Sequence, residues 1–286
     1  MKKNKKWIIT SIILLIVIIL ALVGFMIYGI AKGGTFPFFE KTTSLYENTF
    51  QDITQINVDV TGYDVELRKS TNNEVTIEIT GSEKNKDKMK VEKEDSKLSI
   101  TQDDSIICIG LCLHDEKIII YMPQNIEFVH TSSSGSLTSE VDLTKGSIHT
   151  TSGDILLSNI EEGELQSTSG NIKTGNSTNL NVSATSGDIE LGTIANLIGS
   201  AKSGNVVIDE ITNQIDFTTT SGDMEINKLN INEDSNISAK SGNVDIKLGK
   251  EIFIDATSKN GNIDIHNANQ KPTLKITTTS GDITAK

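Results

Sequence analysis

Apolar and small residues recur through the second half of the chain at fixed distances from a repeated glycine. The second residue after each glycine is aliphatic, and the third residue before it is small. Because residues two apart share one face of a β-strand, these positions predict strands on both sides of the glycine that face a common interior. The glycines concerned are Gly135, Gly153, Gly170, Gly187, Gly204, Gly222, Gly242, Gly261 and Gly281.

The spacing of these glycines, 17 to 20 residues, is typical of a solenoid. Most of them sit in the phrase Ser-Gly-Asp or Ser-Gly-Asn, where glycine tolerates the positive φ of a corner and Asp or Asn binds nearby backbone groups. We therefore predict an all-β fold, a single-stranded parallel β-helix or β-solenoid with coils of 17–20 residues. At about 4.8 Å per rung, nine rungs would make a rod of roughly 40 Å.

The residue after the corner glycine is never Asp in two successive repeats. Carboxylates stacked at one strand spacing would repel each other, and an intervening amide or hydroxyl separates them. The competing interpretation is a ladder of calcium sites, because Gly- and Asp-rich β-rolls bind calcium. Those rolls use a nine-residue repeat, so we favour structural corners and expect no metal and no cofactor.

The N-terminal region has the pattern of a membrane anchor. Residues 1–6 hold four lysines, and residues 7–31 carry no charge. As a helix, 25 residues span about 37 Å, enough for a hydrocarbon core of about 30 Å. The lysines predict a single-pass protein with its N-terminus in the cytoplasm and its C-terminal domain outside the cell membrane. The alternative is a cleaved signal peptide ending at 29–31, although its apolar core would be longer than usual.

Between the anchor and the repeats, residues 32–52 are predicted to form a stalk. Residues 53–130 show alternating apolar positions without the corner phrase, and Asn72-Asn73 predicts a hairpin turn among them. These strands are expected to cap the first edge of the repeats, which occupy 131–286. The whole of 53–286 is thus predicted to be one solenoid domain.

The last repeat, residues 277–286, has nothing after it in the sequence to cover its edge. Lys275 and Lys286 would discourage other chains from pairing there. The bolder hypothesis is that this edge associates end to end with another copy of the chain.

Charge excludes nucleic acid as a partner. The formal net charge is −12, and near −16 without the four N-terminal lysines. The chain contains a single arginine, Arg68. An acidic outer domain repels phosphate backbones.

The sequence yields no catalytic, cofactor-binding or metal residues that we would assign. His114, His130, His149 and His266 are scattered, and His130, at an inward position, is predicted to be a buried side chain with satisfied ring nitrogens. No serine lies in a Gly-x-Ser-x-Gly elbow.

Two pairs of outward carboxylates could resemble those of a glycosidase. They are Glu190 with Asp209 and Glu225 with Asp245. Solvated strand faces carry such charges routinely, so we predict that the protein is not an enzyme. Cys108 and Cys112 are not in Cys-x-x-Cys spacing, and a local disulfide and two free thiols both stay open.

The chain resembles the putative-adhesin domain family, a β-strand-repeat domain of unknown function found in LiaG-like bacterial envelope proteins. The resemblance covers about 53–286 and rests on three features: the Ile-Asn-Val-Asp-Val opening at 56–60, the Ile-Ile-Ile-Tyr-Met-Pro segment at 118–123, and the Thr-Ser-Gly-Asp-Ile repeats. It implies an envelope or surface location and no established reaction.

Together these features predict a membrane-anchored extracellular solenoid that acts as a non-enzymatic, adhesin-like binding or scaffold protein. Its expected partners are the membrane, through the N-terminal helix, and an envelope protein or cell-wall polymer. The alternative is an envelope-stress accessory that regulates a membrane sensor. A carbohydrate-active enzyme is the third interpretation.

Overall fold

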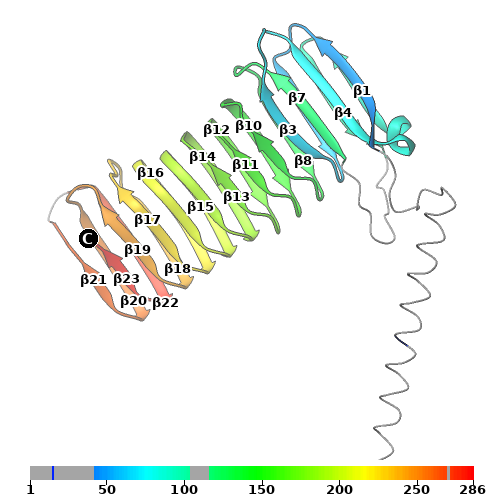
Figure 1. The fold of residues 1–286 in the computed structure, drawn as a ribbon. Coiled ribbons are helices and arrows are strands. Elements are labelled where there is room, and N and C mark those ends of the chain that lie inside the picture. Colours follow the sequence, from blue (N-terminus) through cyan, green and yellow to red (C-terminus); the bar gives the residue numbers. More distant parts are fainter. Residues whose placement is uncertain (1–14, 16–41, 104–115, 269–270) are drawn as a thin grey trace, which may run out of the picture.

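The chain folds into a long stack of β-rungs (Figure 1). A computed structural model describes Leu15 and residues 42–103, 116–268 and 271–286. The predicted cytoplasmic tail and anchor, except Leu15, lie outside the described residues, as do Cys108, Cys112 and His114. Within the described ranges, no helix is both long and apolar enough to cross a bilayer. The predicted all-β solenoid is confirmed.

Each rung consists of two strands joined at a glycine corner, and each strand pairs in parallel with the matching strand of the next rung. In one layer Ile148 of β10 (Leu143–Thr150) lies opposite Leu165 of β12 (Ile160–Ser167). This long-strand layer continues through β14 (Ser177–Ser186), β15 (Ile189–Ser203), β16 (Val206–Ser221), β18 (Ser235–Ser241), β22 (Thr273–Ser280) and β20 (Phe253–Asn260).

The strands after the corners form the second, short-strand layer. There Ile155 of β11 (Ile155–Leu157) lies opposite Ile172 of β13 (Ile172–Thr174). β15 and β16 are long enough to contribute to both layers, because their first residues pair in this layer and their last residues in the other. The other members are β9 (Leu137–Ser139), β17 (Met224–Leu229), β19 (Val244–Leu248), β23 (Ile283–Ala285) and β21 (Ile263–Ile265).

The core runs between the two layers along the whole stack. The predicted aliphatic positions after the corners, such as Ile155, Ile172 and Ile189, are fully buried. They face inward positions of the long strands such as Ile148 and Val182, which are also fully buried. Each rung therefore adds a few aliphatic side chains to one continuous interior, which supplies the main driving force for folding.

The corners require glycine because neighbouring rungs approach closely there. At Gly222 the backbone has φ of +116°, and a Cβ would lie 2.0 Å from the carbonyl oxygen of Gly204 one rung below. Both the backbone conformation and the space exclude any other residue.

A ladder of hydrogen bonds follows the residues next to the corner glycines, which we call the corner row. A side-chain oxygen on each rung accepts the backbone N–H of the equivalent residue on the next rung, at 2.7 to 3.2 Å. In spatial order the corner row reads Asp64, Ser136, Asp154, Asn171, Asp188, Asn205, Asp223, Asn243, Asp282 and Asn262. Carboxylates and uncharged side chains alternate without exception.

The spatial order of the last two rungs differs from their order in the chain. β22 and β23, at the C-terminus, pair with β18 and β19 on one side and with β20 and β21 on the other (Figure 1). The prediction that residues 277–286 form the uncovered edge is therefore wrong. The uncovered end consists of β20 and β21.

The exchange separates residues of like charge on two outward rows. In chain order Asp264 would stack directly on Asp245, whereas in the structure Thr284 lies between them. In the same way Thr279 separates Lys240 of β18 from Lys259 of β20, which would be stacked neighbours in chain order. The register of the residues on either side of Thr279 places it level with both lysines. The inserted rung separates like charges by two strand spacings, about 9.6 Å.

The N-terminal strands extend the stack and then close it. β2 (Gln55–Val60) and β3 (Asp64–Lys69) form a rung that pairs with β8 (Glu127–Ser132) and β9. β6 (Lys97–Gln102) and β7 (Lys117–Met122) follow in parallel. Antiparallel strands β1 (Thr42–Phe50), β4 (Val75–Ser82) and β5 (Met89–Glu94) complete this end, with the 3-10 helix η1 (Glu83–Lys88) between the last two.

Two local predictions in this region differ from the structure. The hairpin at Asn72-Asn73 is wrong, because β7 lies between β3 and β4 and pairs with both. Part of the predicted stalk is strand β1, which pairs with β4. Its alternation is hard to recognise because Thr42–Phe50 has only one buried residue, Leu45.

Candidate functional site

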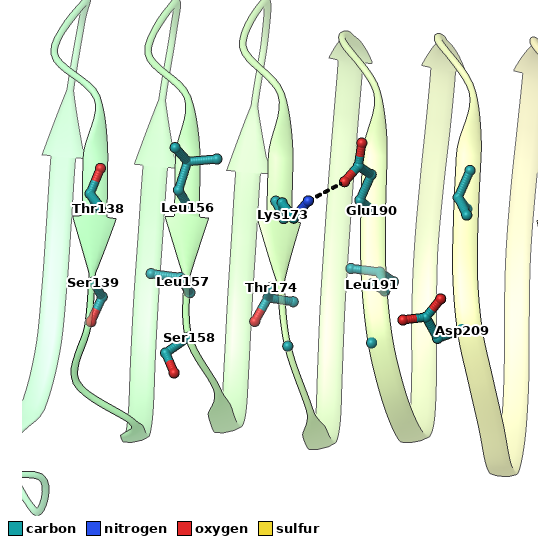
Figure 2. Close-up of a pocket in the computed structure, with 13 residues that line it drawn as sticks. Thr138, Ser139, Leu156, Leu157, Ser158, Lys173, Thr174, Glu190, Leu191 and Asp209 are labelled. Atoms are coloured by element: carbon teal, nitrogen blue, oxygen red, sulfur yellow. Dashed lines mark hydrogen bonds and ion pairs between the residues drawn. The ribbon is translucent and has the colours of Figure 1, made fainter.

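A furrow crosses the outer side of the short-strand layer and runs along the stack (Figure 2). Its residues come from β9, β11, β13, β15 and β16 and from the positions directly after β11 and β13, which makes five successive rungs, and its volume is about 680 Å³. We call it the short-strand furrow. Five rungs at about 4.8 Å give it a length of roughly 20 Å.

One row of outward side chains lines the furrow at matching positions on successive rungs. The strand register places Thr138, Leu156, Lys173, Glu190 and Val207 side by side in that order. Figure 2 shows the first four in line across the strands. Because each rung contributes an equivalent position, any ligand along this row meets a new side chain at every strand spacing.

The second row of the furrow contains Ser158, Gly175, Gly192 and Asp209, so its middle part has no side chains. Gly175 and Gly192 line it at corresponding places on neighbouring rungs. At Gly175 a Cβ would lie 2.2 Å from the carbonyl oxygen of Ser158, so the rungs are too close for any larger residue. These glycines leave backbone groups as the floor of the furrow.

The furrow is mixed in character. Leu156 is 38% exposed and is one of the few exposed large apolar residues of the described chain. Lys173 Nζ lies 2.6 Å from Glu190 Oε2, and this contact raises the pKa of Lys173 above its usual value. Asp209 lines the end beyond Glu190. Along the furrow the site therefore offers an apolar contact at Leu156, then the ion pair between Lys173 and Glu190, and then the carboxylate of Asp209.

The two carboxylate pairs considered from the sequence are placed differently. Glu190 and Asp209 both line the furrow, but Glu190 is held by Lys173. Glu225 lies directly opposite Asp245, and Lys247 Nζ is 3.5 Å from Glu225 Oε1. The closest partner of each glutamate is thus a lysine.

The histidines that the structure describes, His130, His149 and His266, lie on or next to three different strands, β8, β10 and β21. His130 is buried as predicted, but neither ring nitrogen has a hydrogen-bond partner, so the expectation of a satisfied side chain is wrong. His149 lies on the outside, with Nδ1 3.0 Å from Gln166 Oε1. Among the described residues, no three His, Cys, Asp or Glu side chains gather as they would around a metal ion. The corner carboxylates instead accept backbone N–H groups.

The furrow is a feature that the sequence analysis missed. Gly175 and Gly192 each follow a corner glycine, Gly170 or Gly187, by five residues. A second glycine at a constant place in two successive repeats was the available signal for a hollow on that face.

A family model described as Toastrack DUF4097 matches residues 53–194 and again 175–286. These overlapping matches cover the stack from β2 to its end. They support the predicted resemblance to a β-repeat domain of unknown function. No curated protein matches the chain.

Several solved structures are similar in fold. A putative lipid binding protein from Parabacteroides distasonis is 16% identical, with a TM-score of 0.52 over 85% of this chain and 96% of that one. A putative adhesin from Bacteroides fragilis is 17% identical, with a TM-score of 0.42 over 87% and 99%. A putative adhesin from Parabacteroides merdae is 15% identical, with a TM-score of 0.46 over 85% and 96%. At these identities the likeness concerns the fold alone.

Proposed function

The chain belongs to the Toastrack DUF4097 family, and from that premise we propose that it is a non-enzymatic, adhesin-like binding protein of a bacterial cell envelope. Residues 7–31 anchor it in the cell membrane, and the solenoid stands outside the cell. Its ligand is an extended cell-wall polymer that lies in the short-strand furrow.

The direction of the furrow is the observation that carries this proposal. The furrow runs across five rungs, so side chains at equivalent positions follow one another along it at a constant spacing. A linear polymer can lie along such a row and meet one side chain from each rung that it crosses. A small metabolite would use only a fraction of a site about 20 Å long.

The mixed lining also suits binding better than catalysis. Leu156 supplies an apolar contact, while Lys173, Glu190 and Asp209 supply hydrogen bonds to hydroxyl or charged groups. The ion pair between Lys173 and Glu190 is solvent-exposed, so it contributes little to folding stability and is open to exchange for ligand contacts. The polymer proposed here is defined by its regular polar groups and its length.

The test is a length series of linear oligosaccharides released from isolated cell walls and labelled with a fluorophore. We expect the affinity of the purified full chain, in detergent micelles, to rise with oligomer length and to level off at about 20 Å. Leu156→Asp should weaken binding about tenfold by removing the apolar contact. Ile198→Asp, at an exposed residue of the long-strand layer, is the matched control and should not change it.

Added to intact cells, the same probes test the location. Labelling of cells that express the full chain, lost with Leu156→Asp, supports a domain outside the membrane. Binding by the purified chain without labelling of cells would contradict the location. Equal affinity for all lengths, or no binding at all, would contradict the polymer ligand.

A further inference from the structure

The C-terminal end of the stack presents an open strand edge. β20 pairs with β22 and β21 pairs with β23, and neither has a second partner among the described strands. Ile263 occupies the core position after a corner glycine, where Val244 and Ile283 are at most 1% exposed, yet Ile263 is 43% exposed. The interior of the solenoid is thus uncovered at this end.

The free part of the edge can be located by its hydrogen bonds. Both backbone groups of Ile254 that face away from β22 are capped by the side chain of Asn267, at 2.8 and 3.0 Å. Because strand N–H and C=O groups alternate between the two edges, those of Ala256 and Ser258 point the same way as those of Ile254. Unpaired groups of this kind are a template for another strand.

The other end of the described stack is a poor match for this edge. It is closed by antiparallel strands, and its outermost strand in the long-strand layer, β5, carries four exposed charged residues, Lys90, Glu92, Lys93 and Glu94. Head-to-tail stacking would bring this charged strand against the open interior. The surface that best resembles a continuing rung is the same edge of a second copy.

We propose that β20 pairs antiparallel with β20 of a second copy across a two-fold axis at Thr257. In that register Ala256 lies opposite Ser258 of the second copy, so the free backbone groups of both form hydrogen bonds. Asp255 then lies opposite Lys259 of the second copy, and Lys259 opposite Asp255. Both side chains are exposed in the single chain, and opposite charges at such positions favour pairing.

The two-fold axis fixes how the two stacks are oriented in the dimer. The two stacks continue each other, so their N-terminal caps lie at opposite ends of the dimer. This fits copies that approach from opposite sides, such as two facing surfaces. A two-fold contact also closes on itself, so the assembly stops at two copies and forms no fibre.

Charge reversal tests the pairing on the full chain in detergent micelles, with mass measured by light scattering. We expect dimers for the native chain and monomers for both Asp255→Lys and Lys259→Asp, because each places like charges opposite each other. An equimolar mixture of the two variants should dimerise again, since each lysine then meets an aspartate. Unchanged circular dichroism excludes misfolding as the cause, because both residues are exposed.

A cysteine at the axis gives a second readout. In a background with Cys108→Ser and Cys112→Ser, Thr257→Cys should form a dimer-linking disulfide on mild oxidation, because residues opposite each other at a non-hydrogen-bonded position are about 4.5 Å apart. Thr277→Cys, one rung inward, is the matched control and should stay monomeric. Monomers in the native chain, or dimers that persist equally in Asp255→Lys, would overturn the proposal.

Discussion

His130 is the residue whose environment departs furthest from the usual rules for polar groups. It lies on β8 between Val58 of β2 and Ile148 of β10, is fully buried, and stacks on Phe128 with ring centroids 6.2 Å apart. Neither ring nitrogen has a hydrogen-bond partner. Burial lowers the pKa of His130 to about 4, because a charged imidazolium would lose its hydration there.

This environment predicts acid sensitivity. In the unfolded chain a histidine has a pKa of about 6.5 and takes up a proton as the pH falls, whereas folded His130 stays neutral down to about pH 4. The unfolded state therefore binds more protons in this window, and stability falls as the pH falls from about 6.5 to 4. By pH 5 the protonation of His130 in the unfolded chain lowers the free energy of unfolding by about 2 kcal/mol.

Substitution by an apolar side chain isolates this contribution. His130→Leu should remove that part of the pH dependence, so that the variant gains stability relative to the native chain on going from pH 7 to pH 5. Urea denaturation of both chains at the two pH values measures the difference. His149→Leu, at a half-buried residue on the outer face, is the control and should follow the native chain. An equal loss of stability in His130→Leu and the native chain would contradict the assignment.

Among the elements, the corner row explains why the rungs stack in one register. Each residue in it except the last, Asn262, accepts a backbone N–H of the next rung through a side-chain oxygen, and carboxylates occur on every second rung only. The residue two places before the corner glycine is a lysine only on rungs whose corner residue is asparagine, at Lys202, Lys240 and Lys259. These lysines therefore never stand on the same rung as a corner carboxylate.

Breaking the alternation should cost stability. Asn243→Asp would place three carboxylates on successive rungs, with Asp223 and Asp282 as neighbours about 4.8 Å away. At a partly exposed site each new repulsion costs about 1 kcal/mol, so we expect a loss of about 2 kcal/mol at pH 7 and low salt.

Chemical denaturation at pH 7 measures this loss, with 1 M salt as the second condition. Screening should restore most of the stability in high salt. Asn262→Asp, at the end of the stack, has only Asp282 as a neighbour and should lose about half as much. If Asn243→Asp were as stable as the native chain at low salt, repulsion would not be the reason for the alternation.

The rungs themselves could be predicted from the sequence because each carries its own corner phrase and aliphatic pair. The rung of β2 and β3 was not recognised as one, because its corner reads Thr-Gly-Tyr-Asp and lacks the serine. Asp64 nevertheless begins the corner row by accepting the N–H of Ser136. The furrow required the relation between equivalent positions on several rungs, which single residues do not reveal.

At the scale of the whole molecule, the order of the last two rungs could not be read from the buried positions. Ile263 and Ile283 are both aliphatic and would fill the same place in either order. Only outward residues distinguish the two orders, since Asp245 and Asp264 would be stacked neighbours in chain order. The same exchange decides which strands form the open end, and with it the surface available to a second copy.

Disulfide trapping tests most directly whether the rungs stack in parallel and whether β22 lies between β18 and β20. In a background with Cys108→Ser and Cys112→Ser, the pair Asn236→Cys and Lys275→Cys joins residues opposite each other on β18 and β22, within reach of a disulfide. The pair Asn236→Cys and Asp255→Cys is two rungs apart, about 9.6 Å, and out of reach. We predict an intramolecular disulfide, detected by peptide mass spectrometry, in the first pair and none in the second. A disulfide in the second pair, or none in either, would contradict the account.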